Sequence, residues 1–322
     1  MSAALRPSRR AVVLIVGLVV AAAVPLLTDR QDLLNLLFLV WLYITLAESW
    51  NVLGGFAGQV NLGHAAFFGS GALVTRQAWL GGQPLPLALV AGGLAALLFG
   101  LVVGVPTLRL RGVYFSMGTL AVAEALRITI SNTMPLVSAL PADRLADYDL
   151  RERYYLALGL AAAAVATAAI LLQSRLSLGI LAVREDEDAA QSTGVDAFRH
   201  KLMAVALSSF FAGLAGGAFA FHEVSLYPEA AFSPGWTFDA VLVTFVGGVG
   251  TLVGPIVGAL FFIVVREQLA VRLVQVHQVI FGALFILIVL ALPGGLVELW
   301  SRLRRTRAPN ARANEPLLAV DS

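Results

Sequence analysis

The sequence predicts an all-α fold, that of a polytopic membrane protein with about ten transmembrane helices. Of its 322 residues, 59% are hydrophobic and only 13% are charged, whereas a soluble domain carries charge on about a quarter of its residues. Apolar runs that approach the roughly 20 residues needed to cross a bilayer recur along the chain. The formal net charge of +2 does not indicate nucleic-acid binding, and the absence of cysteine excludes disulfides and thiolate chemistry.

Ten apolar segments account for the predicted spans. They are Ala11–Leu27, Leu33–Val52, Ala65–Leu80, Leu85–Val105, Gly112–Thr133, Tyr154–Gln173, Leu202–Phe221, Thr237–Val253, Pro255–Val271 and Val279–Leu292. The first follows a cluster of arginines and resembles a signal peptide, with Ala21–Ala23 in the position of a cleavage site. Because its apolar run is long for a signal sequence, we interpret it as an uncleaved first span.

Arginine and lysine are unevenly distributed between the segments that separate the spans. With the N-terminus inside, 14 of them fall on the inner side and 4 to 6 on the outer side, as the positive-inside rule expects. Residues 174–201 and both termini are therefore expected in the cytoplasm, and residues 135–153 on the other side. Residues 1–296 form one transmembrane domain, and residues 297–322 a basic cytoplasmic tail that we expect to be disordered at its end.

The cytoplasmic loop 174–201 contains the densest run of charge between two spans. Four acidic residues, 185–188, stand where the start of a short helix favours negative charge. Ala189 and Ala190 favour helix, and Gly194 suits the left-handed conformation that ends one. About ten helical residues would make a rod of about 15 Å. The pattern fits either a solvated loop helix or a rod that docks on a partner, with the alanines allowing close approach.

Residues 51–71 form a second unusual stretch, in which glycine and polar residues alternate at membrane depth. The glycines disfavour an uninterrupted helix: Gly54, Gly55, Gly58 and Gly63. The polar side chains are those of Gln59, Asn61 and His64. Broken backbone at this depth is tolerated where it is buried in protein or lines a water-filled cavity, and broken helices form binding sites in transporters. The stretch predicts either the lining of a solute path or a glycine-rich cytoplasmic turn.

Ionisable residues such as Glu48, Glu124 and Arg266 lie inside the predicted spans, where charge is costly and often functional. Glu124 and Arg127 stand three residues apart, so we expect them to neutralise each other. Arg266 and Glu267 are expected to form structural pairs near an interface. Glu48 has no partner in the sequence pattern, which leaves two interpretations: a proton carrier, or a residue near the membrane edge.

Patterns for catalysis, metal binding and nucleotide hydrolysis are missing from the sequence. The histidines lack metal-ligand spacing: His64, His200, His222 and His277. No serine has the His and Asp pattern of a nucleophile, and the P-loop pattern is absent. We therefore predict a protein without catalytic residues, metal or cofactor of its own. If ATP drives it, another chain must hydrolyse the ATP.

Several motifs resemble those of branched-chain amino acid ABC transporter permeases, and in particular the LivM-type subunit. Residues 55–68 (GFAGQVNLGHAAFF) resemble the signature G-Y-x-G-Q-x-S-x-G-H-A-A-F-F. Residues 110–121 resemble R-G-x-Y-F-x-x-x-T-L-A, and residues 184–194 resemble the coupling loop R-E-D-E-x-A-A-x-x-x-G. Residues 247–255 and 293–296 resemble the turn G-G-x-G-T-x-x-G-P and the closing P-x-G-L. The matches run in the family's order from about Asn51 to Leu296.

The resemblance implies a permease in the bacterial inner membrane that works with other chains. These are a second, homologous permease, two cytoplasmic ATPases and an extracytoplasmic substrate-binding protein. The residues implied in docking to an ATPase are Arg184, Glu185, Asp186, Asp188, Ala189, Ala190 and Gly194. Those implied beside the substrate path are Gly58, Gln59, Asn61, Gly63 and His64. Asn61 replaces the usual serine, and Glu48 stands where the family is uncharged.

The predicted function is therefore that of an ABC importer permease for branched-chain or related small polar amino acids. One alternative is an ABC permease for urea or short amides. A second alternative, from a different class, is an ion-coupled secondary transporter with Glu48 or Glu124 as its proton site. These alternatives differ in whether transport needs ATP, a proton gradient or partner chains.

Overall fold

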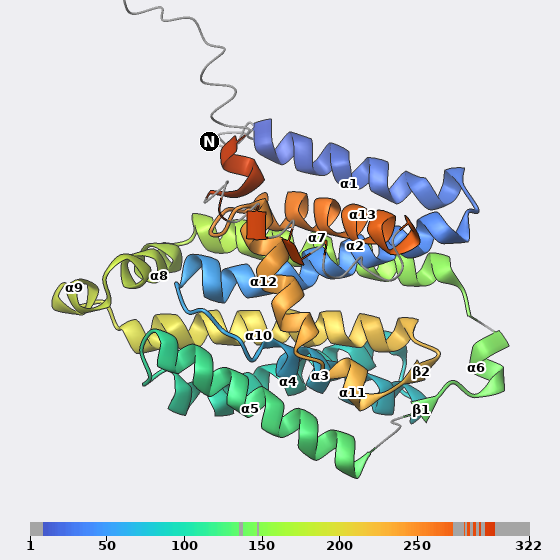
Figure 1. Cartoon of the computed structure of the whole chain (residues 1–322), viewed down its shortest axis with the longest axis horizontal. Helices are drawn as coiled ribbons and strands as arrows, with labels where there is room; N and C mark the ends of the chain where they lie inside the picture. The colour runs from blue at the N-terminus through green and yellow to red at the C-terminus, as the bar shows by residue number, and fades with distance from the viewer. Residues whose placement is uncertain are drawn as a thin grey trace, which may run out of the picture.

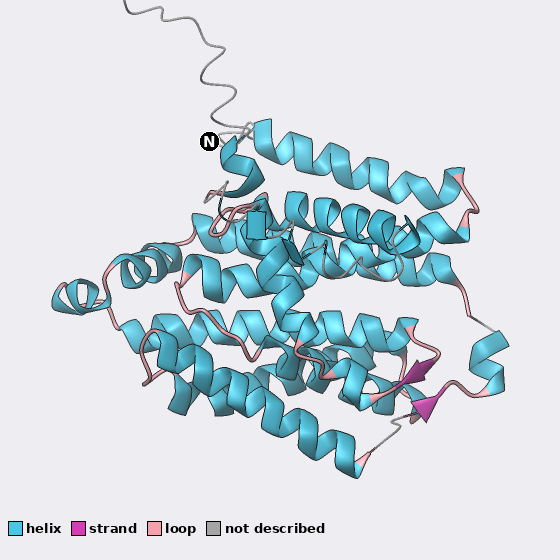
Figure 2. Ribbon diagram, in the orientation of Figure 1, coloured by secondary structure: helices cyan, strands magenta, loops and turns pink. Residues whose placement is uncertain are grey.

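The computed structural model describes residues 9–272, apart from 135–137 and 147, and then residues 280, 282–283, 286–287, 290 and 294–299. Nearly all of the described chain is helical, with one two-stranded sheet (Figures 1 and 2). The longer helices are α1 (Arg9–Leu27), α2 (Gln31–Trp50), α3 (His64–Leu80), α4 (Leu85–Thr107), α5 (Val113–Thr133), α7 (Leu150–Gln173), α8 (Arg175–Glu185), α10 (Ala197–His222), α12 (Gly235–Gly247) and α13 (Gly254–Arg272). The short elements are the π-helix η1 (Asn51–Phe56), α6 (Ala142–Ala146), α9 (Glu187–Ser192), α11 (Pro228–Ala231), β1 (Ser138–Ala139) and β2 (Ser225–Leu226).

Helix α10 lies at the centre of the bundle, where it packs against α2, α3, α4 and α7. Small residues on α10 allow its neighbours to approach closely. A Cβ at Gly216 would lie 1.9 Å from the carbonyl oxygen of Phe68 on α3, so the two backbones touch without a side chain between them. Close contact between small residues is the usual way in which helices associate in a membrane.

Five helical segments of the described chain are long and apolar enough to cross a membrane. They are Gln31–Phe56, Leu85–Thr107, Val113–Thr133, Leu150–Gln173 and Ala197–His222. The prediction of an all-α multi-pass membrane protein is confirmed at this level, whereas the count of ten spans stays a prediction. The predicted span Val279–Leu292 falls largely outside the described residues.

One predicted span was drawn too long. The prediction carried the helix Thr237–Val253 through a glycine-rich stretch, but α12 ends at Gly247. Gly248 has a φ of 131° and Gly250 a φ of 74°, backbone conformations that glycine adopts without steric cost. Residues 248–253 therefore form a turn between α12 and α13 instead of the end of a helix.

The two ends of the bundle carry different connections. In Figure 1, α8 and α9 lie together at the left end, and α6, β1 and β2 lie at the right end. Strands β1 and β2 pair antiparallel, with Ser138 opposite Leu226 and Ala139 opposite Ser225. This pairing ties the connection that follows α5 to the connection that follows α10.

Candidate functional site

The stretch predicted to break a helix is interrupted over seven residues. Helix α2 continues without a gap into η1, whose wider turns end at Phe56. Residues 57–63 are irregular, and α3 begins at His64. Gly58 has a φ of 68°, which is the conformation that reverses the chain here. Short π-helical segments are frequent at functional sites.

The broken segment is joined directly to the loop predicted to dock on an ATPase. Arg184, in the last turn of α8, donates a hydrogen bond from Nη1 to the carbonyl oxygen of Gly55, at 2.7 Å. A Cβ at Gly58 would lie 3.0 Å from Cγ of Arg184, so the arginine stem also packs on the turn. The residues predicted beside the substrate path and those predicted to dock on an ATPase are therefore in direct contact.

The turn between α12 and α13 is the third component of this junction. Oδ1 of Asn51, the first residue of η1, accepts a hydrogen bond from the Gly250 amide at 2.8 Å. Nδ2 of Asn51 donates to the Thr251 carbonyl at 3.0 Å. A Cβ at Gly250 would lie 2.6 Å from Nη1 of Arg184. We call the contact of η1, Arg184 and this turn the junction.

The predicted path residues are held by hydrogen bonds within the chain. Trp50 donates from Nε1 to the Asn61 carbonyl at 2.8 Å, and Oδ1 of Asn61 accepts from the Gly63 amide at 2.8 Å. Ser49 donates its proton to the Leu46 carbonyl, so its oxygen accepts from Nε2 of His64 at 2.8 Å. This network assigns the proton of the His64 ring to Nε2 and leaves Nδ1 as an acceptor.

The predicted path residues differ widely in their exposure. Gly58 is exposed and Gln59 is half-buried, whereas Asn61, Gly63 and His64 are buried in this chain. Asn61 and His64 therefore shape the broken segment from inside. Their predicted place beside a solute path is not tested by these contacts and stays a prediction.

Helix α5 supports the broken segment from the other side. Ser116 donates to the Val60 carbonyl at 2.6 Å, and Oγ1 of Thr119 accepts from the Leu62 amide at 3.2 Å. A Cβ at Gly63 would lie 2.3 Å from the Thr119 carbonyl oxygen. Only glycine fits at position 63 while α5 stays in place.

The loop predicted to be a single rod consists of two helices at an angle. Asp186 is extended (φ −155°, ψ 110°) and separates α8 from α9. Its Oδ1 accepts from the amides of Asp188 and Ala189, at 3.0 and 2.9 Å, which is the usual action of a capping aspartate. The acidic start of a helix and the left-handed Gly194 (φ 88°) are confirmed. The predicted length is wrong, because Arg184 and Glu185 belong to α8 and α9 has only 6 residues.

Helix α9 is fixed to the rest of the chain by one buried ion pair. Nζ of Lys201 on α10 lies 2.5 Å from Oε2 of Glu187, and the lysine side chain is only 2% exposed. Arg111, which precedes α5, contacts Asp188 at 3.0 Å. That second pair is open to solvent and contributes little to stability.

The two alanines of α9 face in opposite directions. Ala190 is 5% exposed and packs with Val183 and Ala197, whereas Ala189 is exposed. The expectation that both alanines allow a partner to approach is therefore wrong for Ala190, which fills the contact of α9 with α8 and α10. Ala189, Glu185 and Asp188 are exposed and remain available to a partner.

Comparisons with known proteins agree with these motifs. A family model described as the permease component of a branched-chain amino acid transport system matches residues 32–289. The chain belongs to this family. Two relatives are named high-affinity branched-chain amino acid transport system permease protein LivM, and each is 29% identical to this chain. The match with LivM of Salmonella typhimurium covers 88% of this chain and 73% of the relative. The match with LivM of Escherichia coli covers 89% of this chain and 74% of the relative. A probable LivM of Methanocaldococcus jannaschii is 25% identical over 39% of this chain and 41% of its own length. No solved structure matches the chain.

The predicted resemblance to branched-chain amino acid permeases is thus confirmed, and the chain is a multi-pass membrane protein of a transport family. Its relatives carry the names of transport permeases and not of enzymes.

Charged residues inside the permease behave only partly as predicted. Glu124 and Arg127 form the expected pair, with Nη2 and Oε1 2.5 Å apart. Arg266 pairs with Asp239 on α12 at 3.3 Å and donates to the Tyr43 hydroxyl at 2.8 Å. Tyr43 in turn donates to Asp239 at 2.6 Å.

The group formed by Tyr43, Asp239 and Arg266 joins α2, α12 and α13, and the sequence pattern did not reveal it. Asp239 stands alone in an apolar helix, and Tyr43 lies 196 residues before it. An acidic residue inside a predicted span was the one available signal, because such a residue needs a partner.

Glu48 is buried within the permease. It is 1% exposed, and neither carboxylate oxygen has a hydrogen-bond partner among the described residues. Burial within the chain does not test whether Glu48 lies near the membrane edge or carries a proton, so both interpretations stay predictions. The amide group of Asn51, one turn further on, is engaged with Gly250 and Thr251.

Proposed function

We propose that this permease forms the membrane path of an ATP-binding-cassette importer for branched-chain or related small polar amino acids. It lies in the bacterial inner membrane with both termini in the cytoplasm and contains no cofactor. An extracytoplasmic binding protein delivers the solute, a second homologous permease completes the path, and two cytoplasmic ATPases hydrolyse ATP. The family and the LivM relatives support the solute class.

One observation supports the coupling of this chain to an ATPase, namely the hydrogen bond from Arg184 to Gly55. Helices α8 and α9 extend from one end of the bundle (Figure 1), and α9 presents Asp188 and Ala189 to solvent. A movement of α8 driven by a docked ATPase would be carried by the arginine to η1. Because η1 leads into the irregular residues 57–63, this movement would change the shape of the broken segment.

The path residues have two tasks in this proposal. Gly58 and Gln59 are accessible and stand beside the solute. Asn61, Gly63 and His64 hold the broken segment against α5 and α2. The segment can then move as a unit, without exposing unpaired backbone groups to an apolar environment.

A secondary transporter is the second candidate, and Glu48 is the observation that favours it. A buried carboxylate such as that of Glu48, which has no hydrogen-bond partner among the described residues, is typical of a proton site in a transporter. In the importer, the same residue packs next to η1 and carries no proton across the membrane. The two functions differ in their source of energy, which an uptake experiment separates.

The test is leucine uptake into proteoliposomes of defined composition. The importer function predicts uptake only when the full chain, the second permease, both ATPases, the binding protein and ATP are all present. Uptake by the purified chain alone under a proton gradient would overturn it in favour of the secondary transporter. Faster uptake of urea or acetamide than of leucine by the full assembly would contradict the proposed solute class.

A further inference from the structure

Three basic side chains are almost completely buried in the described part of the chain, and each of them holds one end of the central helix α10. They are Arg76, Arg153 and Lys201, which are 0%, 1% and 2% exposed. A buried cation is stable only when it is paired or hydrogen-bonded. The partners of these three side chains therefore show how each end of α10 is held in place.

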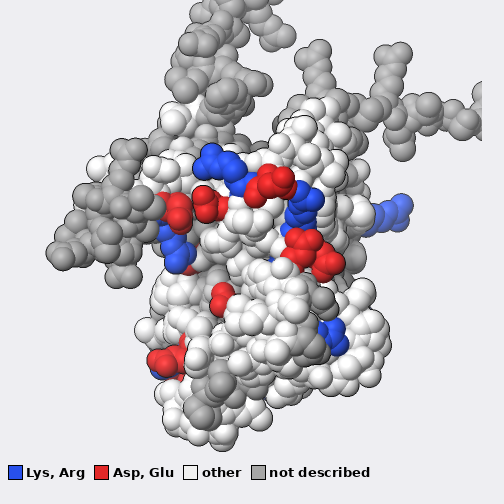
Figure 3. All heavy atoms as spheres, turned by 90° about the vertical axis from the view of Figure 1, so that its right-hand side faces the viewer, with Lys and Arg blue, Asp and Glu red and all other residues white. Residues whose placement is uncertain are grey.

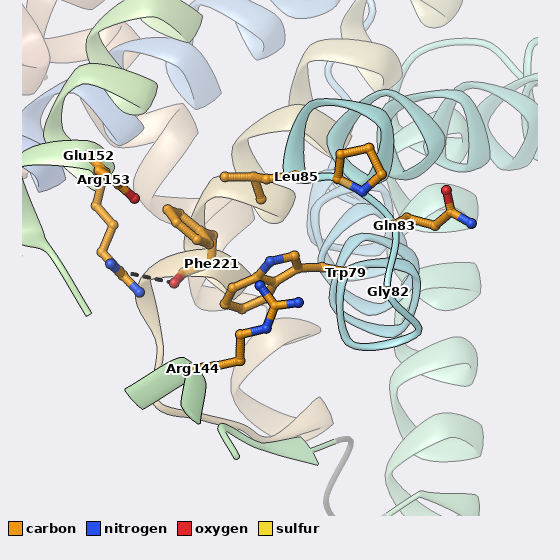
Figure 4. Close-up of a pocket in the computed structure, with 9 residues that line it drawn as sticks. Trp79, Gly82, Gln83, Leu85, Arg144, Glu152, Arg153 and Phe221 are labelled. Carbon is orange, nitrogen blue, oxygen red and sulfur yellow. Dashed lines mark hydrogen bonds between the residues drawn. The ribbon is translucent and has the colours of Figure 1, made fainter. Parts of the chain in front are cut away.

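At the end of the bundle that carries α6, the two arginines hold the last carbonyl groups of α10. Arg76 on α3 donates from Nη1 to the Ala220 carbonyl at 2.9 Å. Arg153 on α7 donates from Nε to the Phe221 carbonyl at 3.1 Å, the bond drawn in Figure 4. Figure 3 views the molecule from this end and shows other basic and acidic side chains on its surface. The last carbonyls of a helix have no partner within the helix, so these bonds fix the end of α10 to α3 and α7.

The other end of α10 is held by a single ion pair to α9. Lys201, the only lysine in the sequence, lies near the start of α10. Its Nζ is 2.5 Å from Oε2 of Glu187, the first residue of α9. In the described chain this carboxylate is the one partner of the ammonium group. The cation at this end of α10 therefore depends on one residue of the helix that is predicted to dock on the ATPase.

The same ion pair sets which face of α9 is exposed. With 6 residues, α9 is too short to be stable by itself, so its direction depends on its contacts with α8 and α10. Glu187 and Ala190 stand three residues apart and lie on one face of the helix, which meets α10. Asp188 and Ala189 are exposed. Lys201 thus helps to decide which side chains α9 presents to a partner.

We propose that Lys201 is a positioning residue that connects α9 to α10 and gives the importer a second route of coupling, separate from the contact of Arg184 with Gly55. A docked ATPase that moves α9 would move Glu187, and Lys201 would carry this movement to the start of α10. The far end of α10 stays fixed by the two arginines. Because α10 packs against α2, α3, α4 and α7, its shift would change the packing of the whole bundle. This inference rests on the proposed function, since it assumes that α9 receives the ATPase.

The first test measures how fast a thiol reagent labels Ala190→Cys in the purified full-length chain in nanodiscs, without other subunits. The natural chain has no cysteine, and Ala190 is 5% exposed, so we expect slow labelling. Lys201→Met keeps an apolar side chain of similar length and leaves no buried charge, so the chain should melt close to the wild-type temperature. Labelling in this variant should be faster by a factor of about ten or more, because the charged contact that holds α9 is lost. Glu187→Gln should also speed labelling and should lower the melting temperature, because it leaves a buried charge unpaired.

The second test measures leucine uptake and ATP hydrolysis by the full assembly in proteoliposomes. Lys201→Met should lower uptake by a factor of about ten or more while hydrolysis stays within about twofold of the wild type. A residue that only stabilised the chain would lower both activities together, through loss of assembled protein. The reversed pair, Lys201→Glu with Glu187→Lys, restores the contact and should recover most of the uptake, whereas Lys201→Glu alone should not.

The matched control is Arg199→Ala. Arg199 lies on the same turn of α10 as Lys201, and its ion pair with Asp196, at 3.0 Å, is open to solvent. Labelling, uptake and hydrolysis in this variant should match those of the wild type. Equal labelling of Ala190→Cys with and without Lys201→Met would overturn the inference, and so would a parallel fall of uptake and hydrolysis in the assembly. ATP-driven uptake by the wild-type assembly tests the proposed function separately, because the labelling rates are measured on this chain alone.

Discussion

Arg184 and Gly55 lie 129 residues apart in the sequence and are joined by a hydrogen bond of 2.7 Å. The arginine lies in the last turn of α8, at the predicted ATPase side, and the glycine belongs to the π-helix that precedes the broken segment. A charged donor on a backbone carbonyl contributes about 1.5–3 kcal/mol. In the proposed mechanism, this contact makes the two segments move together.

Asn51 is expected to stabilise the junction. Asn51→Ala leaves the Gly250 amide and the Thr251 carbonyl without their partners, which should cost about 2–3 kcal/mol. The apparent melting temperature of the detergent-solubilised chain should fall by several degrees. Gln59→Ala is the control, because among the described residues the Gln59 side chain makes a single long hydrogen bond, of 3.5 Å, to the Ala57 carbonyl. Equal melting temperatures of the two variants would show that the Asn51 contacts contribute nothing.

Gly63 should not tolerate even one additional carbon atom. In Gly63→Ala the new methyl group would lie 2.3 Å from the Thr119 carbonyl oxygen, which forces α5 away from the broken segment and should cost at least about 2 kcal/mol. The control is Gly159→Ala on α7, where no described atom lies within 4 Å of the new carbon apart from the neighbouring part of α7 itself. We expect the melting temperature of the Gly63→Ala variant to fall below that of the wild type. The melting temperature of the Gly159→Ala variant should stay the same or rise. A stable Gly63→Ala chain would contradict the packing of α5 described above.

The two alanines of α9 should respond differently to enlargement. Ala189 is exposed, so Ala189→Trp should weaken co-purification with the ATPases without lowering the melting temperature of the chain. Ala190 is packed between α8 and α10, so Ala190→Trp should destabilise the chain itself by about 1–3 kcal/mol. If the Ala189→Trp variant co-purifies with the ATPases normally, α9 does not dock on them and is a solvated loop helix.

The orientation in the membrane can be tested with single cysteines, because the natural chain has none. An impermeant thiol reagent applied to intact cells should label Ala142→Cys and spare Ser192→Cys. Ala142 is exposed and is a better probe than Ser138, whose hydroxyl accepts a 2.6 Å hydrogen bond from Arg76. Labelling of the Ser192→Cys variant alone would contradict the predicted topology.

Local features of this fold could be predicted from the sequence. The four glycines in residues 54–63 predicted an interrupted helix, and the acidic run predicted a capped helix start, because both effects act within one or two turns. The family motifs also include Gly55, Arg184 and Gly250, one residue from each of the three components of the junction.

Contacts between distant parts of the chain could not be predicted in this way. The pairing of Arg184 with Gly55 depends on how α8 folds back onto η1, and the group of Tyr43, Asp239 and Arg266 depends on the packing of three helices. The inward direction of Ala190 depends on the break at Asp186, which the alanine-rich pattern did not indicate. Each of these contacts is set by tertiary packing rather than by local sequence.

The coupling of ATP hydrolysis to uptake in Arg184→Ala tests the central claim most directly. Uptake of leucine and hydrolysis of ATP should be measured together in proteoliposomes that contain the full assembly. Arg175→Ala is the control, since Arg175 lies on the same helix, is exposed and makes no hydrogen bond or ion pair among the described residues. If Arg184 links the ATPase side to η1, Arg184→Ala should lower uptake by a factor of ten or more while hydrolysis stays within about twofold of the wild type. Uptake and hydrolysis that both match the Arg175→Ala control would contradict the claim.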